Sequence, residues 1–141
     1  MSQFIKSYRA EVGINHVPAY QVSGRPFATA SLDASVTNGT KIEFPFVTRW
    51  IYVQNNGGGD VKVGFSQNGV LGTNYFKVPR MSERGAEGGT PGNSIRLELK
   101  ISELYLSGSN NVDVCAGLTT IPVSRVKTDS GASFSGSVGV G

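Results

Sequence analysis

The sequence predicts an all-β protein, and three observations favour this fold class. Short segments alternate apolar and polar residues with the period of two that is typical of a half-buried strand. Turns rich in Gly and Asn separate these segments, and no long stretch carries helical periodicity. Charged residues make up only 16% of the chain, and its 19 glycines suit many turns. We therefore expect an antiparallel β-sandwich, a single jelly roll of about eight strands, with an immunoglobulin-like sandwich as the main alternative.

Three parts follow one another along the chain. Residues 1–24 are expected to form an extended N-terminal arm, and residues 25–122 carry the strand pattern. Residues 123–141 form a C-terminal tail rich in Gly and Ser. The 141 residues suit one ordinary domain, which can bury a core without disulfides or metal.

The first strands are expected in the segments RPFATASLDA and SVTNGTKIEFPF. One strand begins at residue 25 and ends near Ala34. In the second segment, Asn38-Gly39 is a strong signal for a tight turn. Apolar residues then recur at every second position: Ile42, Phe44 and Phe46. Pro45 cannot donate a backbone hydrogen bond, so this strand lies at a sheet edge or ends there.

The segment TRWIYVQNNGGGDVKVGFS places a Gly-rich loop between two apolar stretches. Before the loop, Trp50 and Tyr52 share one face and Ile51 and Val53 share the other; after it, residues 61–65 alternate again. A phosphate-binding loop would lead into a helix and would end in Gly-Lys-Ser/Thr. This loop leads into a strand, so we predict a hairpin whose glycines supply positive φ.

Further strands are expected in the second half of the chain. The segment QNGVLGTNYFKVP predicts a loop and then a short strand at residues 75–78, and residues 80–93 form a long polar loop. Three more alternating segments follow. Their inward positions are Ile95, Leu97 and Leu99, then Leu104 and Leu106 with Tyr105 opposite, then Val112, Val114 and Ala116 with Asp113 outward.

No arrangement of residues indicates catalysis. His16 is the only histidine, which argues against a zinc site, and no G-x-S-x-G motif supports a Ser-His-Asp triad. Cys115 lies in a predicted strand and is interpreted as a small buried residue. Glu98 and Glu103 could be the paired carboxylates of a glycoside hydrolase, but solvated charge is the favoured interpretation. We predict that the protein is not an enzyme and holds no cofactor or metal.

Composition also limits the partners and the compartment. The net charge of +3 is mild and the basic residues are scattered, so we expect no specific nucleic-acid partner. No stretch approaches the roughly 18 uncharged apolar residues of a membrane helix. The N-terminal residues lack the apolar core of a secretory signal, and the one cysteine cannot form an internal disulfide. We expect a soluble protein that is made in the cytosol and not inserted in a membrane.

Two groups of apolar residues could contact a ligand or a partner. One group is aromatic and is interpreted as core, with a platform that stacks sugars or bases as the alternative: Tyr8, Tyr20, Trp50, Tyr52 and Tyr75. The other lies in the N-terminal arm, which could pack on a neighbouring subunit or fold back as an extra edge strand. The candidate inter-subunit contacts are Phe4, Ile5, Tyr8, Val12, Ile14, Tyr20 and, in the tail, Phe134.

The segments TRWIYVQN, VKVGFSQNGVLGTNYFKVP, LELKISELYLSG and VDVCAGLTTIP resemble small single jelly-roll capsid proteins of large icosahedral DNA viruses. The nearest type is the penton protein that closes five-fold vertices, and the resemblance covers roughly residues 20–122. It implies a virion protein without catalysis that is assembled in the host cytoplasm. Five copies would form a ring and contact the major capsid protein and other minor capsid proteins. A decoration protein, another minor capsid protein or a lectin-like, carbohydrate-binding sandwich on a virion fibre is the alternative.

Overall fold

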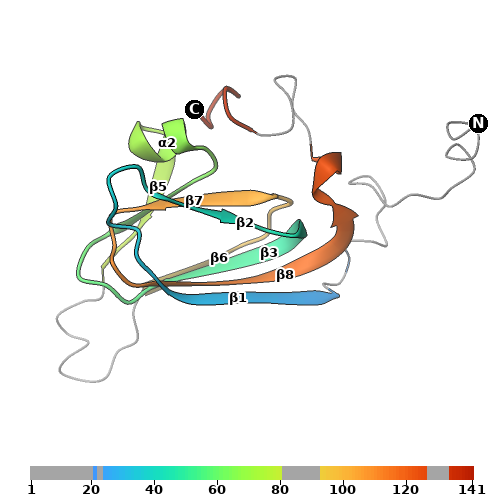
Figure 1. Cartoon of the computed structure of the whole chain (residues 1–141), viewed down its shortest axis with the longest axis horizontal. Coiled ribbons are helices and arrows are strands. Elements are labelled where there is room, and N and C mark those ends of the chain that lie inside the picture. Colours follow the sequence, from blue (N-terminus) through green and yellow to red (C-terminus); the bar gives the residue numbers. More distant parts are fainter. Residues whose placement is uncertain (1–20, 22–23, 81–92, 127–133) are drawn as a thin grey trace, which may run out of the picture.

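The fold consists of two antiparallel sheets that pack face to face (Figure 1). The computed structural model describes residues 21, 24–80, 93–126 and 134–141. Within these ranges the strands are β1 (Arg25–Leu32), β2 (Thr40–Glu43), β3 (Phe46–Asn55), β4 (Val61–Gly64), β5 (Tyr75–Val78), β6 (Asn93–Leu97), β7 (Glu103–Ser107) and β8 (Val112–Pro122). The first sheet has the order β1-β8-β3-β6 and the second sheet the order β2-β7-β4-β5. The predicted all-β sandwich is confirmed.

The strand pairs are nested along the chain. β1 pairs with β8, β2 with β7, β3 with β6, and β4 with β5. The chain therefore forms one long hairpin whose two arms pass alternately through the first and the second sheet. Two further pairings, β3 with β8 and β4 with β7, join neighbouring strands within each sheet. Residues far apart in the sequence thus become neighbours across both sheets.

Aliphatic side chains fill the space between the sheets. Ile51 and Val53 from the first sheet and Leu104 and Leu106 from the second are fully buried in one cluster. Burial of each such side chain stabilises the fold by roughly 1.5–3 kcal/mol. The other inward positions that alternation predicts are buried or packed against this cluster: Ile95, Leu97, Leu99, Val112, Val114 and Ala116. The predicted core face is confirmed for these strands.

Turn and edge signals near the start of the domain are also confirmed. Gly39 has a φ of 72°, and its amide donates to the Val36 carbonyl oxygen at 3.0 Å, which closes the turn before β2. β2 ends at Glu43, ahead of Pro45, and it is an edge strand of the second sheet. A residue without an amide proton is tolerated there because no neighbouring strand requires it.

The prediction of a hairpin at the Gly-rich loop is wrong. The loop joins β3 of the first sheet to β4 of the second sheet, so the strands on either side are not partners. None of the three glycines has a positive φ. A Cβ on Gly57 would lie 2.2 Å from Ser109 Oγ, and one on Gly59 would lie 2.8 Å from the Gly108 carbonyl oxygen. Glycine is required here because the loop packs closely against the turn between β7 and β8.

A short helix replaces part of the loop predicted before β5. Helix α2 spans Gln67–Leu71, and the Ser66 hydroxyl caps it by accepting from the Gly69 amide at 2.9 Å. Side-chain capping of this kind satisfies a helix donor that has no partner within the helix. After β8 the chain makes one 3-10 turn, η2, at Val123–Arg125.

Candidate interaction surfaces

Glu98 and Glu103, which were considered as a pair of catalytic carboxylates, both form ion pairs. Glu98 is 54% exposed and pairs with Arg49 and Arg96, which confirms its interpretation as a solvated charge. Glu103 is only 13% exposed and pairs with Lys41 at 3.0 Å, so the same interpretation is wrong for Glu103. Among the residues that the structure describes, no three His, Cys, Asp or Glu side chains come together in a way that could hold a metal ion. His16 lies outside the described residues.

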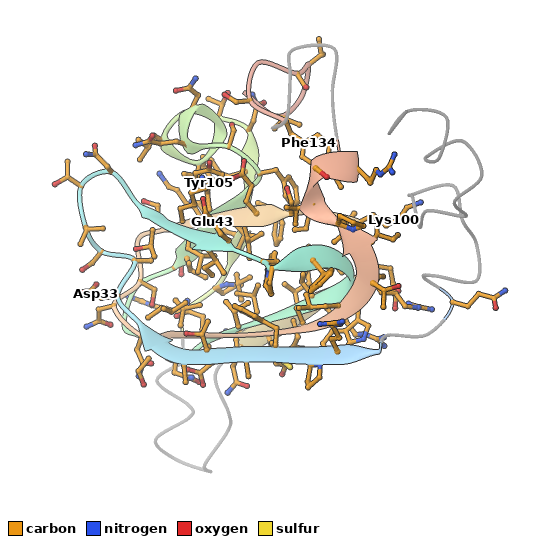
Figure 2. The ribbon with its side chains drawn as sticks, turned by 45° about the vertical axis from the view of Figure 1, so that its right-hand side comes forward. Asp33, Glu43, Lys100, Tyr105 and Phe134 are labelled. Atoms are coloured by element: carbon orange, nitrogen blue, oxygen red, sulfur yellow. The ribbon has the colours of Figure 1, made fainter. Side chains whose placement is uncertain are left out.

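The outer face of the second sheet carries charges that pair with one another. The Lys41 ammonium lies 2.7 Å from a Glu43 carboxylate oxygen and 3.0 Å from one of Glu103. Hydrogen bonds to Glu43 and then Glu103 hold the pKa of Lys41 well above its ordinary value, and the bond to Lys41 lowers the pKa of Glu43. Burial, reinforced by the Glu103 charge, raises the pKa of the nearby Tyr105 hydroxyl (Figure 2).

Lysines also cover the tyrosine rings of this face. Lys62 Nζ lies 4.8 Å from the centre of the Tyr75 ring, and Lys41 Nζ lies 5.9 Å from the centre of the Tyr105 ring. Such cation–π contacts contribute about 0.5–1 kcal/mol at exposed sites. The face therefore shows paired charges and tyrosine rings that lie beside lysine ammonium groups.

The outer face of the first sheet has a different composition. Trp50 and Tyr52 project from β3, and both are half-buried and outside the core. Small residues lie opposite them in the register: Gly117 faces Trp50, and Cys115 faces Tyr52. The Arg96 guanidinium carbon lies 5.3 Å from the centre of the Trp50 ring. On this face, large side chains on β3 therefore stand next to small side chains on β8.

Two predictions about these residues are wrong. The interpretation as core fails for Trp50, Tyr52 and Tyr75, which are all half-buried on outer faces. Cys115 was expected to be buried, but it is half-exposed because Val114 and Ala116 on either side of it point inward. Because side chains alternate along β8, Cys115 must face outward when Val114 and Ala116 face the core. Tyr8 and Tyr20 lie outside the described residues.

A buried asparagine that sequence reasoning missed joins the two sheets at one end. Asn55 ends β3 and is fully buried. Its Oδ1 accepts from the Gly57 amide at 3.0 Å and from the Ser109 hydroxyl at 2.7 Å. Its Nδ2 lies 2.8–3.2 Å from three carbonyl oxygens: Gly59, Val78 and Pro79. The signal that could have indicated this role is the alternation itself, which places Asn55 on the same inward face as Ile51 and Val53.

The C-terminal segment 134–141 folds against the end of the sandwich near α2 (Figures 1 and 2). Phe134 packs on the main core and also on a small buried cluster of Val47, Ile121 and Val126. The Ser66 Oγ lies 2.7 Å from the Val140 carbonyl oxygen and 2.9 Å from that of Gly141. A Cβ on Gly69 would lie 2.0 Å from the Val140 oxygen, so only glycine allows this approach.

Phe134 is the one candidate inter-subunit contact within the described residues, and its ring packs on its own chain. The other six lie outside those residues, so their role stays a prediction: Phe4, Ile5, Tyr8, Val12, Ile14 and Tyr20.

Comparisons with family models, with curated proteins and with solved structures give no match for this chain. In the part of the chain that the structure describes, no helix is both long enough and apolar enough to cross a membrane. The strand topology and the two outer faces are therefore the features from which a function can be inferred.

Proposed function

We propose that this chain is a structural subunit of an icosahedral virion: a single jelly-roll capsid protein that forms the penton at the five-fold vertices and performs no catalysis. The nested strand pairing carries this proposal. A jelly roll is an eight-stranded double sheet that contains two Greek keys, and it is common among viral capsid and lectin domains. Rolling up one long hairpin produces the pairs 1–8, 2–7, 3–6 and 4–5, which are the pairs seen here.

The same pairing argues against the immunoglobulin-like alternative. In that fold, the first two strands are neighbours in one sheet. Here β1 and β2 lie in different sheets, and β4 with β5 is the one sequential pair among the described strands. The strand orders therefore favour a jelly roll.

The assembly that we propose is a homopentamer held by one heterologous interface repeated five times. Its low charge content, 16% of residues, suits a subunit with neighbours on several sides. The N-terminal arm would supply contacts to the next subunit, to the major capsid protein and to other minor capsid proteins. The resemblance of residues 20–122 to penton proteins supports the same assignment, with a virion location after assembly in the host cytoplasm.

Native mass spectrometry of the purified chain over a concentration series tests this proposal. A pentamer is the expected result, and it would support the proposal strongly because closed rings of five are uncommon among ordinary soluble oligomers. A trimer would instead favour a decoration protein or a fibre knob. A chain that stays monomeric at high concentration together with its capsid partners, and that is missing from particles, would overturn the proposal.

Point variants test which residues hold the ring. Phe4→Ser and Tyr8→Ser are expected to shift the pentamer toward monomer, because each removes an apolar side chain from the proposed interface. Val36→Ser is the matched control, since Val36 is a large hydrophobic residue that is 50% exposed in a loop of the sandwich. If all three variants assemble equally, the arm does not form the interface.

A further inference from the structure

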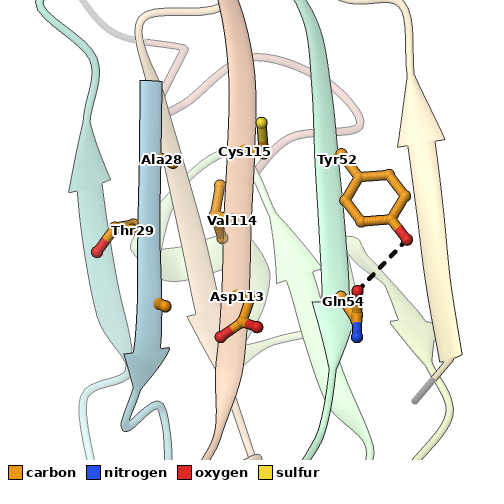
Figure 3. Close-up of a pocket in the computed structure, with 8 residues that line it drawn as sticks. Ala28, Thr29, Tyr52, Gln54, Asp113, Val114 and Cys115 are labelled. Carbon is orange, nitrogen blue, oxygen red and sulfur yellow. Dashed lines mark hydrogen bonds between the residues drawn. The ribbon is translucent and has the colours of Figure 1, made fainter. Parts of the chain in front are cut away.

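A shallow groove lies on the outer face of the first sheet. It has a volume of about 350 Å³ and lies across β1, β8 and β3 (Figure 3). Tyr52 and Gln54 of β3 line one side, and Ala28 of β1 and Cys115 of β8 line the other. This volume falls at the lower end of the range of small-molecule sites, roughly 300–1,000 Å³.

Side-chain size along one row of the sheet creates the groove. Ala28 pairs with Cys115, and Cys115 pairs with Tyr52, so a short, a short and a long side chain stand side by side. Tyr52 therefore borders a floor of small residues, and its ring extends from β3 on the side away from Cys115 (Figure 3). A tyrosine ring offers a rigid apolar surface with a polar tip, and it loses little conformational entropy on binding.

Polar side chains close one end of the groove in a connected chain of hydrogen bonds. Gln54 Nε2 donates to Asn56 Oδ1 at 2.9 Å, and Asn56 Nδ2 donates to Asp113 Oδ2 at 2.9 Å. These bonds orient the Gln54 amide, whose Oε1 lies 3.5 Å from the Tyr52 hydroxyl. An amide and a carboxylate have more hydrogen-bonding capacity than these contacts use, so a ligand hydroxyl could still bind to them.

A β-bulge holds the same end of the groove in place. Between Thr29 and Leu32 the register of β1 advances by three residues while its partner β8 advances by two, from Val114 to Val112. Ser31 within this bulge has a φ of 56°, which is rare for a residue other than glycine. Its amide donates to Asp113 Oδ1 at 2.9 Å. Bulges often occur beside functional sites, where they redirect the side chains around them.

We propose that this groove binds an uncharged pyranose sugar. A pyranose ring has an apolar face of C–H groups that suits the Tyr52 ring, and hydroxyl groups that suit Gln54 and Asp113. The Asp113 carboxylate would repel an anionic sugar, whereas it would accept hydrogen bonds from neutral hydroxyls. Binding of a sugar here does not require the capsid role, because the groove lies on one face of a single subunit.

The chain contains reporters for this test at the groove itself. Trp50, the only tryptophan, is two residues from Tyr52 on the same face of β3, and Cys115, the only cysteine, lines the groove. The full chain would be titrated with lactose, maltose, cellobiose and mannobiose while Trp50 emission is recorded. We expect at least one disaccharide to bind with a Kd of about 1 mM, a value in keeping with the few contacts of a small ligand. The same sugar should slow alkylation of Cys115 by iodoacetamide.

Variants separate binding in the groove from binding elsewhere. Tyr52→Ala should weaken the binding of that disaccharide by about tenfold or more, because the main apolar contact is lost. Tyr75→Ala is the matched control, since Tyr75 is a half-buried tyrosine on the second sheet, and it should bind as the wild type does.

Several outcomes would overturn the proposal. One is that none of the four disaccharides binds the wild type with a Kd below about 10 mM. Another is that Tyr52→Ala binds unchanged, or that Cys115 is not protected. Tighter binding of 3′-sialyllactose than of lactose would contradict the choice of an uncharged sugar. If Tyr52→Ala fails to fold, protection of Cys115 in the wild type still decides the question.

Discussion

On the second sheet, Tyr75 and Tyr105 lie under lysine ammonium groups, whereas on the first sheet Tyr52 lines an open groove. The inner faces of the two sheets show no such difference, because both contribute fully buried aliphatic residues to one core. Packing between the sheets constrains the inner faces, while the outer faces are free to differ. The two outer faces can therefore differ in what they bind, although the core between them is shared.

The largest expected effect tests whether the inner faces are equivalent. Ile51→Ala removes a fully buried side chain from the first sheet, and Leu104→Ala removes one from the second. Each should lower the free energy of unfolding by about 2–5 kcal/mol, because a cavity remains where the side chain was. Urea denaturation followed by circular dichroism measures both. A loss confined to one of the two variants would show that the sheets do not share one cooperative core.

The second prediction concerns the junction between the sheets at Asn55. Asn55→Ala leaves the buried Ser109 hydroxyl and several backbone groups without their partner. We expect a loss of about 3 kcal/mol in the free energy of unfolding, since each unsatisfied buried group costs about 1–3 kcal/mol. Asn56→Ala is the control for stability, because Asn56 is half-exposed and water can replace its contacts. Equal losses in the two variants would contradict the proposed junction.

The third prediction separates close packing from backbone freedom in the Gly-rich loop. Gly57→Ala places a Cβ 2.2 Å from Ser109 Oγ, so the loop must shift, and we expect a loss of about 1–3 kcal/mol. Gly58→Ala is a matched control, because no atom lies within 4 Å of its added Cβ and its φ is not positive. Thermal unfolding of both variants measures the difference. Similar melting temperatures would show that close approach is not the reason for glycine at residue 57.

The sequence predicts where the strands lie better than it predicts which strands pair with one another. The period of two in residues 50–54 and 61–65 identifies two strands, but it is the same whether the chain turns back in one sheet or crosses to the other. The pattern therefore predicts a hairpin at the loop after Asn55, whereas the loop crosses between the sheets. Partner choice depends on contacts between residues far apart in the sequence, which a local pattern does not contain.

The orientation of β3 shows a second limit. Ile51 and Val53 alternate with Trp50 and Tyr52, so both faces of this strand look apolar in the sequence. Gln54 continues the aromatic face and indicates that this face is the outer one, but Asn55 continues the other face and is buried. Alternation places Asn55 on the inward face, but its role in joining the sheets follows only from its hydrogen-bond partners. The groove also depends on the bulge at Ser31. Nothing in the local sequence predicts that β1 contains one more residue here than its partner strand.

The smallest expected effect concerns the ion pairs of the second sheet. The pKa of Glu43 is lowered in the folded chain, so its stabilising contribution is present above its ordinary value of 4.5 and is lost as the pH falls through the lowered value. The pKa of Lys41 is raised, so its contribution is complete below 10.5 and is lost as the pH rises beyond that value. Lys41→Met should lower Tm by only a few degrees at pH 7, because surface ion pairs contribute little. The loss should be smaller at pH 3, because part of the Glu43 contribution is already absent there. Lys77→Met on β5 is the control, and an equal pH dependence in both variants would show that the pairs of Lys41 are not the cause.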